Sequence, residues 1–246
     1  MKKLLLSASV VLLATGAFAQ TTTMTGSDAR FGIKAGVNLA RFHSSGDNSN
    51  EAFNDNVKDN VGFNVTAFAD FGVGNNFFIQ PGISLQNKGA KFESVGVANV
   101  GNTTITTTTT SKTNLMAIEV PVNAVFRIPT GAAGAIQISA GPYVGFNISG
   151  KDKGDVTTTT LNNTTNTSSS ATIANDRDLS FGSASDKNYG STDFGANFGL
   201  AYRTNSGFLV GANYGLGLTD LTPKDRRDNS NKLTNRVLGF SVGYSF

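Results

Sequence analysis

Apolar and polar residues alternate with a period of two along eight stretches of the chain. In the first stretch the odd positions from Phe31 to Leu39 are apolar, and the positions between them are Gly, Lys, Gly and Asn. Such alternation predicts a β-strand with one apolar face. The eight stretches cover residues 31–39, 61–71, 77–86, 116–128, 136–148, 193–203, 208–218 and 235–246.

The connections between these stretches alternate between long and short. The short ones, 72–76, 129–135 and 204–207, are turn-like, whereas 40–60, 87–115, 149–192 and 219–234 are long and polar. A tilted strand needs about 9–11 residues to cross a bilayer. Long loops outside and tight turns in the periplasm are typical of outer-membrane barrels. The pattern predicts an all-β fold, an eight-stranded antiparallel up-and-down transmembrane β-barrel with long extracellular loops, short periplasmic turns and both chain ends on the periplasmic side.

The apolar faces of these strands are expected to contact lipid. A closed barrel pairs every backbone group without leaving an edge, which hydrocarbon requires. The opposite faces hold mostly Gly, Ser, Asn, Gln and a few charges, which suit a packed polar lumen. A girdle of aromatic residues is expected at the periplasmic ends of the strands: Phe31, Phe71, Phe77, Phe126, Tyr202, Phe208 and Phe246.

The first residues have the features of an export signal. Lys2 and Lys3 precede an uncharged, mostly apolar run over 4–14, and Ala17-Phe18-Ala19 forms a small-x-small cleavage site. The run is shorter than the roughly 20 residues of a spanning helix. We expect residues 1–19 to be a signal peptide and 20–246 to be the barrel domain.

Composition excludes several classes of function. The chain has no Cys and a single His, which rules out disulfides and thiolate metal sites. Removing Lys2 and Lys3 leaves 18 basic residues (20 − 2) against 17 acidic ones and no basic stripe, so no nucleic-acid partner is expected. No cofactor or metal site is predicted.

A set of charged residues points into the predicted lumen by strand parity: Lys34, Asp70, Lys88, Glu119, Arg127, Asp193 and Arg203, with Lys88 included if its strand runs two residues further. These charges could form a salt-bridged plug or line a path for small solutes. The plug is favoured because eight strands leave a narrow bore.

A third possibility, a lipid-modifying enzyme, rests on His43 in the first long connection, near Ser44, Ser45 and Asp47. Triad geometry needs rigid supports, and this stretch is rich in Asn, Ser and Gly. A solvated loop histidine and a non-enzymatic protein are therefore expected.

Threonine tracts occupy two of the long connections, at 103–110 and 157–160. Their composition cannot bury a core, so they are either mobile or strand extensions above the membrane. Mobile solvated loops are the default expectation, and a surface adhesin or phage-receptor role is the functional alternative.

Several short segments resemble the porin-family or PorT-like outer-membrane β-barrel proteins. The matching segments are FGIKAGVN at 31–38, IEVP at 118–121, GPYVG at 141–145 and DFG at 193–195. The closing residues Tyr244 to Phe246 resemble the terminal aromatic signal that the barrel assembly machinery reads. The resemblance implies an eight-stranded outer-membrane barrel, but no single activity.

The combined expectation is an integral protein of the cell outer membrane, exported and non-enzymatic, with a polar plugged lumen and surface-exposed loops in a structural or interaction role. The alternative is a narrow porin-like channel for ions or small solutes. Expected partners are outer-membrane lipid, the barrel assembly machinery acting through Tyr244 and Phe246, and an unidentified extracellular partner of the loops.

Overall fold

The structure, a computed structural model, describes residues 29–46, 51–227 and 230–246. The predicted signal peptide at 1–19 lies outside the described residues. The elements, in chain order, are β1 (Arg30–Gly46), α2 (Glu51–Asn56), β2 (Val57–Lys58), β3 (Asn60–Gly72), β4 (Phe77–Val100), β5 (Thr103–Pro129), η2 (Gly131–Ala133), β6 (Gly134–Asn162), β7 (Thr167–Asp178), β8 (Thr192–Thr204), β9 (Phe208–Gly217), η3 (Lys224–Arg226) and β10 (Asn231–Ser245).

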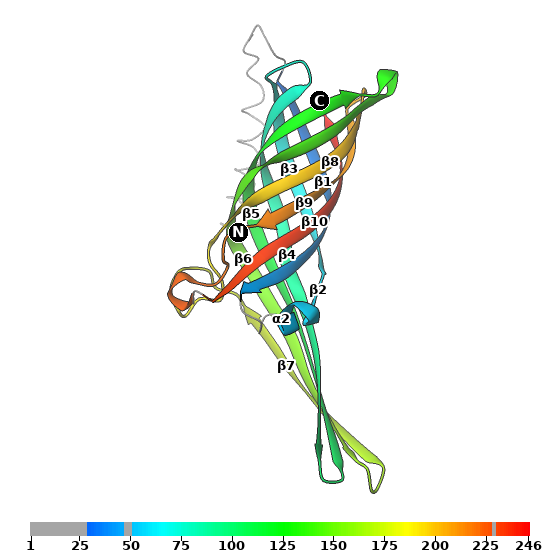
Figure 1. Cartoon of the computed structure of the whole chain (residues 1–246), viewed down its shortest axis with the longest axis vertical. Coiled ribbons are helices and arrows are strands. Elements are labelled where there is room, and N and C mark those ends of the chain that lie inside the picture. The colour runs from blue at the N-terminus through cyan, green and yellow to red at the C-terminus, as the bar shows by residue number, and fades with distance from the viewer. Residues whose placement is uncertain (1–28, 47–50, 228–229) are drawn as a thin grey trace, which may run out of the picture.

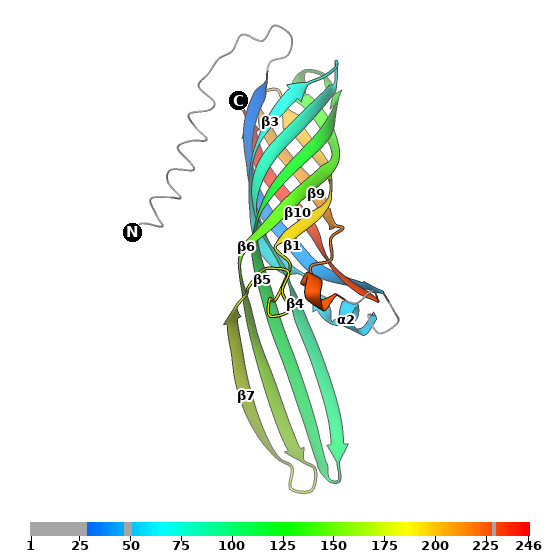
Figure 2. The same cartoon turned by 90° about the vertical axis from the view of Figure 1, so that its left-hand side faces the viewer.

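Eight of these strands pair into a closed antiparallel ring (Figures 1 and 2). Its order is β4-β3-β1-β10-β9-β8-β6-β5, and β5 pairs again with β4. The first and last strands of the chain meet at a seam that runs from the Gly32–Ser245 pair to the Gly46–Asn231 pair. The predicted all-β, up-and-down barrel is confirmed.

The two faces of the barrel wall have the opposite polarity to a soluble protein. Val37 and Phe240 are cross-strand partners on the outer face and are 50% and 46% exposed, whereas Asn38 beside them points inward and is fully buried. Apolar contacts on the outside and polar groups on the inside suit a wall surrounded by lipid, because lipid solvates apolar side chains and not amides.

Aromatic residues gather at the end of the barrel that carries the tight turns. Phe77 pairs across strands with Phe126. Phe208 and Tyr244 make an edge-to-face contact with ring centroids 5.3 Å apart, and Tyr244 contacts Phe246 in the same way at 5.4 Å. These rings form part of the predicted aromatic girdle, because amphipathic and aromatic side chains favour the membrane interface.

Three ring strands, β4, β5 and β6, continue beyond the ring and are joined there by β7 in an extended sheet, which corrects the default expectation of mobile threonine loops. The extended sheet comprises residues 91–100 of β4, 103–112 of β5, 151–162 of β6, and β7, and it projects away from the barrel in Figure 2. Thr is β-branched and suits the pleated backbone. The strand-extension alternative therefore describes both threonine tracts.

The other two long connections pack against the end of the barrel. Residues 40–60 contain the end of β1, α2 and β2, while 219–234 contain η3 and the start of β10. Among the described residues, no helix is long and apolar enough to cross a membrane.

Close packing at the seam gives a test of ring closure. A Cβ added at Gly36 would collide with the backbone carbonyl of Phe240 on the neighbouring strand, whereas one added at Gly96 in the extended sheet meets only the Thr107 carbonyl oxygen, at 4.0 Å. We expect Gly36→Ala to destabilise the barrel by roughly 1–3 kcal/mol through overpacking. The shift between compact and unfolded gel mobility on heating should then occur at a lower temperature, with Gly96→Ala unchanged. Equal transition temperatures for the two variants would contradict the close packing of β1 against β10 at the seam.

Candidate functional site

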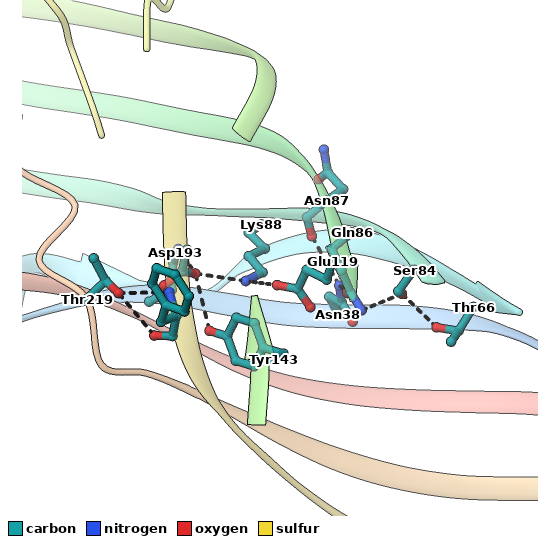
Figure 3. Close-up of polar contacts among 12 residues, drawn as sticks. Asn38, Thr66, Ser84, Gln86, Asn87, Lys88, Glu119, Tyr143, Asp193 and Thr219 are labelled. Atoms are coloured by element: carbon teal, nitrogen blue, oxygen red, sulfur yellow. Dashed lines mark hydrogen bonds and ion pairs between the residues drawn. The ribbon is translucent and has the colours of Figure 1, made fainter. Parts of the chain in front are cut away.

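The barrel interior contains a buried cluster of charges near the end that carries the extended sheet. Lys88 of β4 forms ion pairs with Glu119 of β5 and with Asp193 of β8, whose Oδ2 lies 3.1 Å from the Lys88 Nζ. The Tyr143 hydroxyl and the Asn235 side-chain amide donate to the same carboxylate oxygen of Asp193, each at 3.2 Å. We call these five residues the upper ion cluster; Figure 3 labels Lys88, Glu119, Tyr143 and Asp193.

Strand continuity explains why Lys88 reaches this cluster. β4 continues well past residue 86, so the inward parity of Gln80 and Ser84 carries on to Lys88. Its ammonium also lies 4.8 Å from the centroid of the Tyr143 ring. One cation is thus shared between two carboxylates and an aromatic face, and its partner Asp193 lies 105 residues away in the sequence.

A second charged group lies toward the tight turns, and we call it the lower ion cluster. Asp70 of β3 pairs with Arg127 of β5, and Gln80 Nε2 of β4 donates to Asp70 Oδ1 at 2.7 Å. The Arg127 guanidinium lies 3.8 Å from the centroid of the Phe78 ring. Each carboxylate oxygen of the buried Asp70 thus accepts from one donor, and these bonds offset part of the cost of burying the charge.

Lys34 and Arg203 are the two predicted lumen charges without an ion pair among the described residues. Lys34 lies 6.0 Å from the Phe68 ring centroid and lines two small interior cavities. Arg203 is buried at the end of β8. The structure therefore joins five of the seven predicted charges into two clusters and leaves these two apart.

Between the two clusters, neutral side chains form a network that the sequence analysis did not single out. The Asn38 side-chain amide donates to Gln86 Oε1 at 2.7 Å and accepts from Asn64 at 2.7 Å. Gln86 donates to the Ser84 hydroxyl at 2.8 Å, which in turn bonds the Thr66 hydroxyl at 2.6 Å (Figure 3). The signal that could have identified this network was strand parity, because it predicts inward-pointing amides and hydroxyls in the same way as inward-pointing charges.

Empty space in the lumen is limited. Two cavities of about 40 and 50 Å³, both lined by Lys34, Phe68 and Gln80, lie in the middle of the barrel, and a third of about 10 Å³ lies beside Lys88 and Glu119. A cavity needs roughly 10–15 Å³ to hold one water molecule. The cavities therefore have room for a few water molecules.

An apolar cluster lies directly above the upper ion cluster, and we call it the apolar cap. Its buried members come from strand ends and from the long connections: Phe42, Val57, Ala90, Leu115, Leu179 and Leu221. Leu115 pairs across strands with Lys88, which places the cap next to the charges. The sequence analysis missed it, because isolated apolar residues in polar connections show no periodicity.

Hydrogen bonds and rings hold the connections in the apolar cap. Tyr189 packs on Phe42 with centroids 5.6 Å apart, and burial raises the pKa of the Tyr189 phenol. The Leu221 amide donates to the Leu233 carbonyl at 2.8 Å, and the Gly190 amide donates to the Leu221 carbonyl at 2.7 Å. Parts of the long connections are thus packed over this mouth of the barrel.

His43 lies in β1, paired across strands with Thr234, rather than in a loop. In the described part of the chain no side chain forms a hydrogen bond or ion pair with its ring, and Asp47 lies outside that part. No group of three or more His, Cys, Asp or Glu residues suited to a metal occurs in residues 29–46, 51–227 and 230–246.

A family model described as outer membrane protein beta-barrel domain matches residues 18–223. The chain belongs to this family. It is an outer-membrane β-barrel protein whose apolar outer face contacts lipid, and the predicted localisation is confirmed. The PorT-like part of the resemblance stays a prediction.

Solved structures similar to this outer-membrane barrel include two bacterial surface proteins. Ail, the attachment invasion locus protein of Yersinia pestis, crystallised with the heparin analogue sucrose octasulfate, is 13% identical with a TM-score of 0.37, covering 89% of this chain and 99% of that one. Neisserial surface protein A is 11% identical with a TM-score of 0.35, covering 87% and 95%. No curated protein matches the sequence.

The upper ion cluster gives a test of the interior. Lys88→Met leaves the Glu119 and Asp193 carboxylates buried without their cation, and loss of one partner of a buried pair costs about 3–5 kcal/mol. Arg41→Met is the control, because the Arg41–Asp59 pair is 46% and 49% exposed and is worth at most about 1 kcal/mol. Denaturant unfolding in lipid vesicles measures both. Equal losses in the two variants would contradict the cluster.

Proposed function

We propose that this protein is a closed, non-enzymatic barrel that anchors the extended sheet at the cell surface in a structural or interaction role. The supporting observation is the series of upper ion cluster, amide network, lower ion cluster and apolar cap along the lumen, with small cavities between their side chains. Side chains fill an eight-stranded barrel readily, because its interior is narrow.

The direction of insertion follows from the connections. Tight turns face the periplasm and long connections face outward in bacterial barrels, so the extended sheet and the apolar cap are extracellular. Export by the signal peptide at 1–19 delivers the chain to the periplasm. The barrel assembly machinery then recognises the aromatic end, where Tyr244 and Phe246 make their edge-to-face contact.

A narrow channel for ions or small solutes is the second candidate. The observation that favours it is Lys34, a lumen cation without an ion pair among the described residues, which lines both mid-barrel cavities. A path would require these cavities to join and the apolar cap to open.

Conductance distinguishes the two functions. Purified protein in planar bilayers is expected to show no steady openings, because ion pairs and the apolar cap interrupt the bore. A channel would show steady openings, and Lys34→Glu would change its ion selectivity. Steady openings whose ion selectivity changes in Lys34→Glu would contradict the closed anchor and support the channel.

Surface labelling tests the direction of insertion. The chain has no native Cys, so a single introduced thiol is the only reactive one. We expect Asn102→Cys, at the tip of the extended sheet, to react with a membrane-impermeant maleimide on intact cells. Asn75→Cys, in the tight turn between β3 and β4, should react only after lysis. The reverse labelling pattern would show that the barrel is inserted in the opposite direction.

A further inference from the structure

The extended sheet has two open edges. On one side, β4 lacks a second partner over 93–100, since β2 pairs only with Lys91 and Phe92. On the other, β7 is paired only with β6 along its full length, 167–178. In the described part of the chain, no further strand covers either edge.

Neither edge is protected in the usual ways. Natural sheets blunt their edges with Pro, Lys, bulges or covering segments, because unpaired N–H and C=O groups recruit other strands. Residues 93–100 and 167–178 contain no Pro and no Lys, and their charges are Glu93 together with 176–178 near the barrel. Apolar side chains stand exposed on both edges, Val97 at 62% and Ile173 at 70%.

The two edges run in opposite directions. Consecutive strands of the extended sheet are antiparallel, so β4 runs toward the tip while β7 runs back toward the barrel (Figure 2). Two copies inserted the same way up in one membrane therefore present β7 of one antiparallel to β4 of the next. Two β7 edges, or two β4 edges, would meet in parallel.

The register inside one sheet also fits the next copy. One row of the sheet runs Val97, Thr106, Thr159, Ser170. Continued into a neighbouring copy, it sets Ser170 beside Val97 of the next chain, and 167–174 beside 93–100. Toward the barrel, β2 already occupies the place beside Lys91 and Phe92, so the added pairing is confined to 93–100.

We propose that the extended sheet binds a second copy of this chain by strand addition, with β7 of one protein pairing with residues 93–100 of the next. Backbone hydrogen bonds provide the attraction, and the end of β2 beside Phe92 limits the pairing to residues 93–100. The contact is heterologous, so copies extend into rows or rings on the cell surface. The inference rests on the proposed extracellular position of the sheet.

Paired cysteines test this contact in intact outer membranes. Val97→Cys and Ser170→Cys lie on opposite edges of one sheet, three strand spacings or about 14 Å apart, too far for a disulfide within one chain. Across the proposed contact their Cβ atoms are about 5 Å apart. A mild oxidant or a short thiol cross-linker should therefore join Val97→Cys/Ser170→Cys chains into dimers and longer ladders.

Single variants and an internal pair are the matched controls. Cells that co-express separate Val97→Cys and Ser170→Cys chains should give dimers only, while each single variant alone should give none. Thr106→Cys/Thr159→Cys, a directly paired position inside one sheet, should cross-link within the monomer. Compact gel mobility before heating shows that each variant has folded.

Each outcome decides between the ideas. Dimers from either single variant would overturn the β7-to-β4 contact in favour of a like-edge contact. Monomers from the double variant, with both thiols reactive toward impermeant maleimide on intact cells, would overturn self-association while leaving the surface position intact. Thiols that stay unlabelled until lysis would overturn both the surface position and this inference.

Discussion

Backbone pairing in hydrocarbon is the constraint on which this structure depends. A peptide group facing lipid tails has no water to bond, so each N–H and C=O must find a partner in the chain. The ring from β4 round to β5 achieves this without an edge. Once the outer face is apolar, the period of two places every second residue in a narrow interior, and the polarity of the lumen follows from the same rule.

The lumen then has to satisfy its own polar groups. Unpaired buried charges are expensive, and one lysine shared by Glu119 and Asp193 offsets part of that cost. A slip of one residue in register would turn Lys88 from the lumen to the outer face, so the cluster forms only in the observed register. The apolar cap lies next to the upper ion cluster, because its Leu115 is the cross-strand partner of Lys88.

Periodicity in the sequence predicted the barrel but not everything built on it. It located all eight ring strands, because lipid and lumen impose different side chains on the two faces. The third apolar–polar stretch ended near residue 86 in the sequence. Beyond Gly89 both faces of β4 are solvated except at the apolar cap, so the difference in polarity between the two faces fades. In the threonine tracts the two faces are alike, so no period marks β5 or β6 there. Strand parity predicted that charges such as Asp193 point into the lumen. It did not predict their height along the barrel axis, and therefore could not predict the pairing of Asp193 with Lys88.

The same pairing rule has a different consequence above the membrane. The ring has no edges, so the open edges of the extended sheet are the places where this fold can add a strand. Water satisfies these edges in an isolated copy, which makes pairing optional rather than obligatory. Insertion in one orientation removes much of the rotational and translational freedom that association in solution would cost. An edge contact of eight residues, too small to hold two soluble proteins together, becomes effective between barrels that already share a membrane and face the same way.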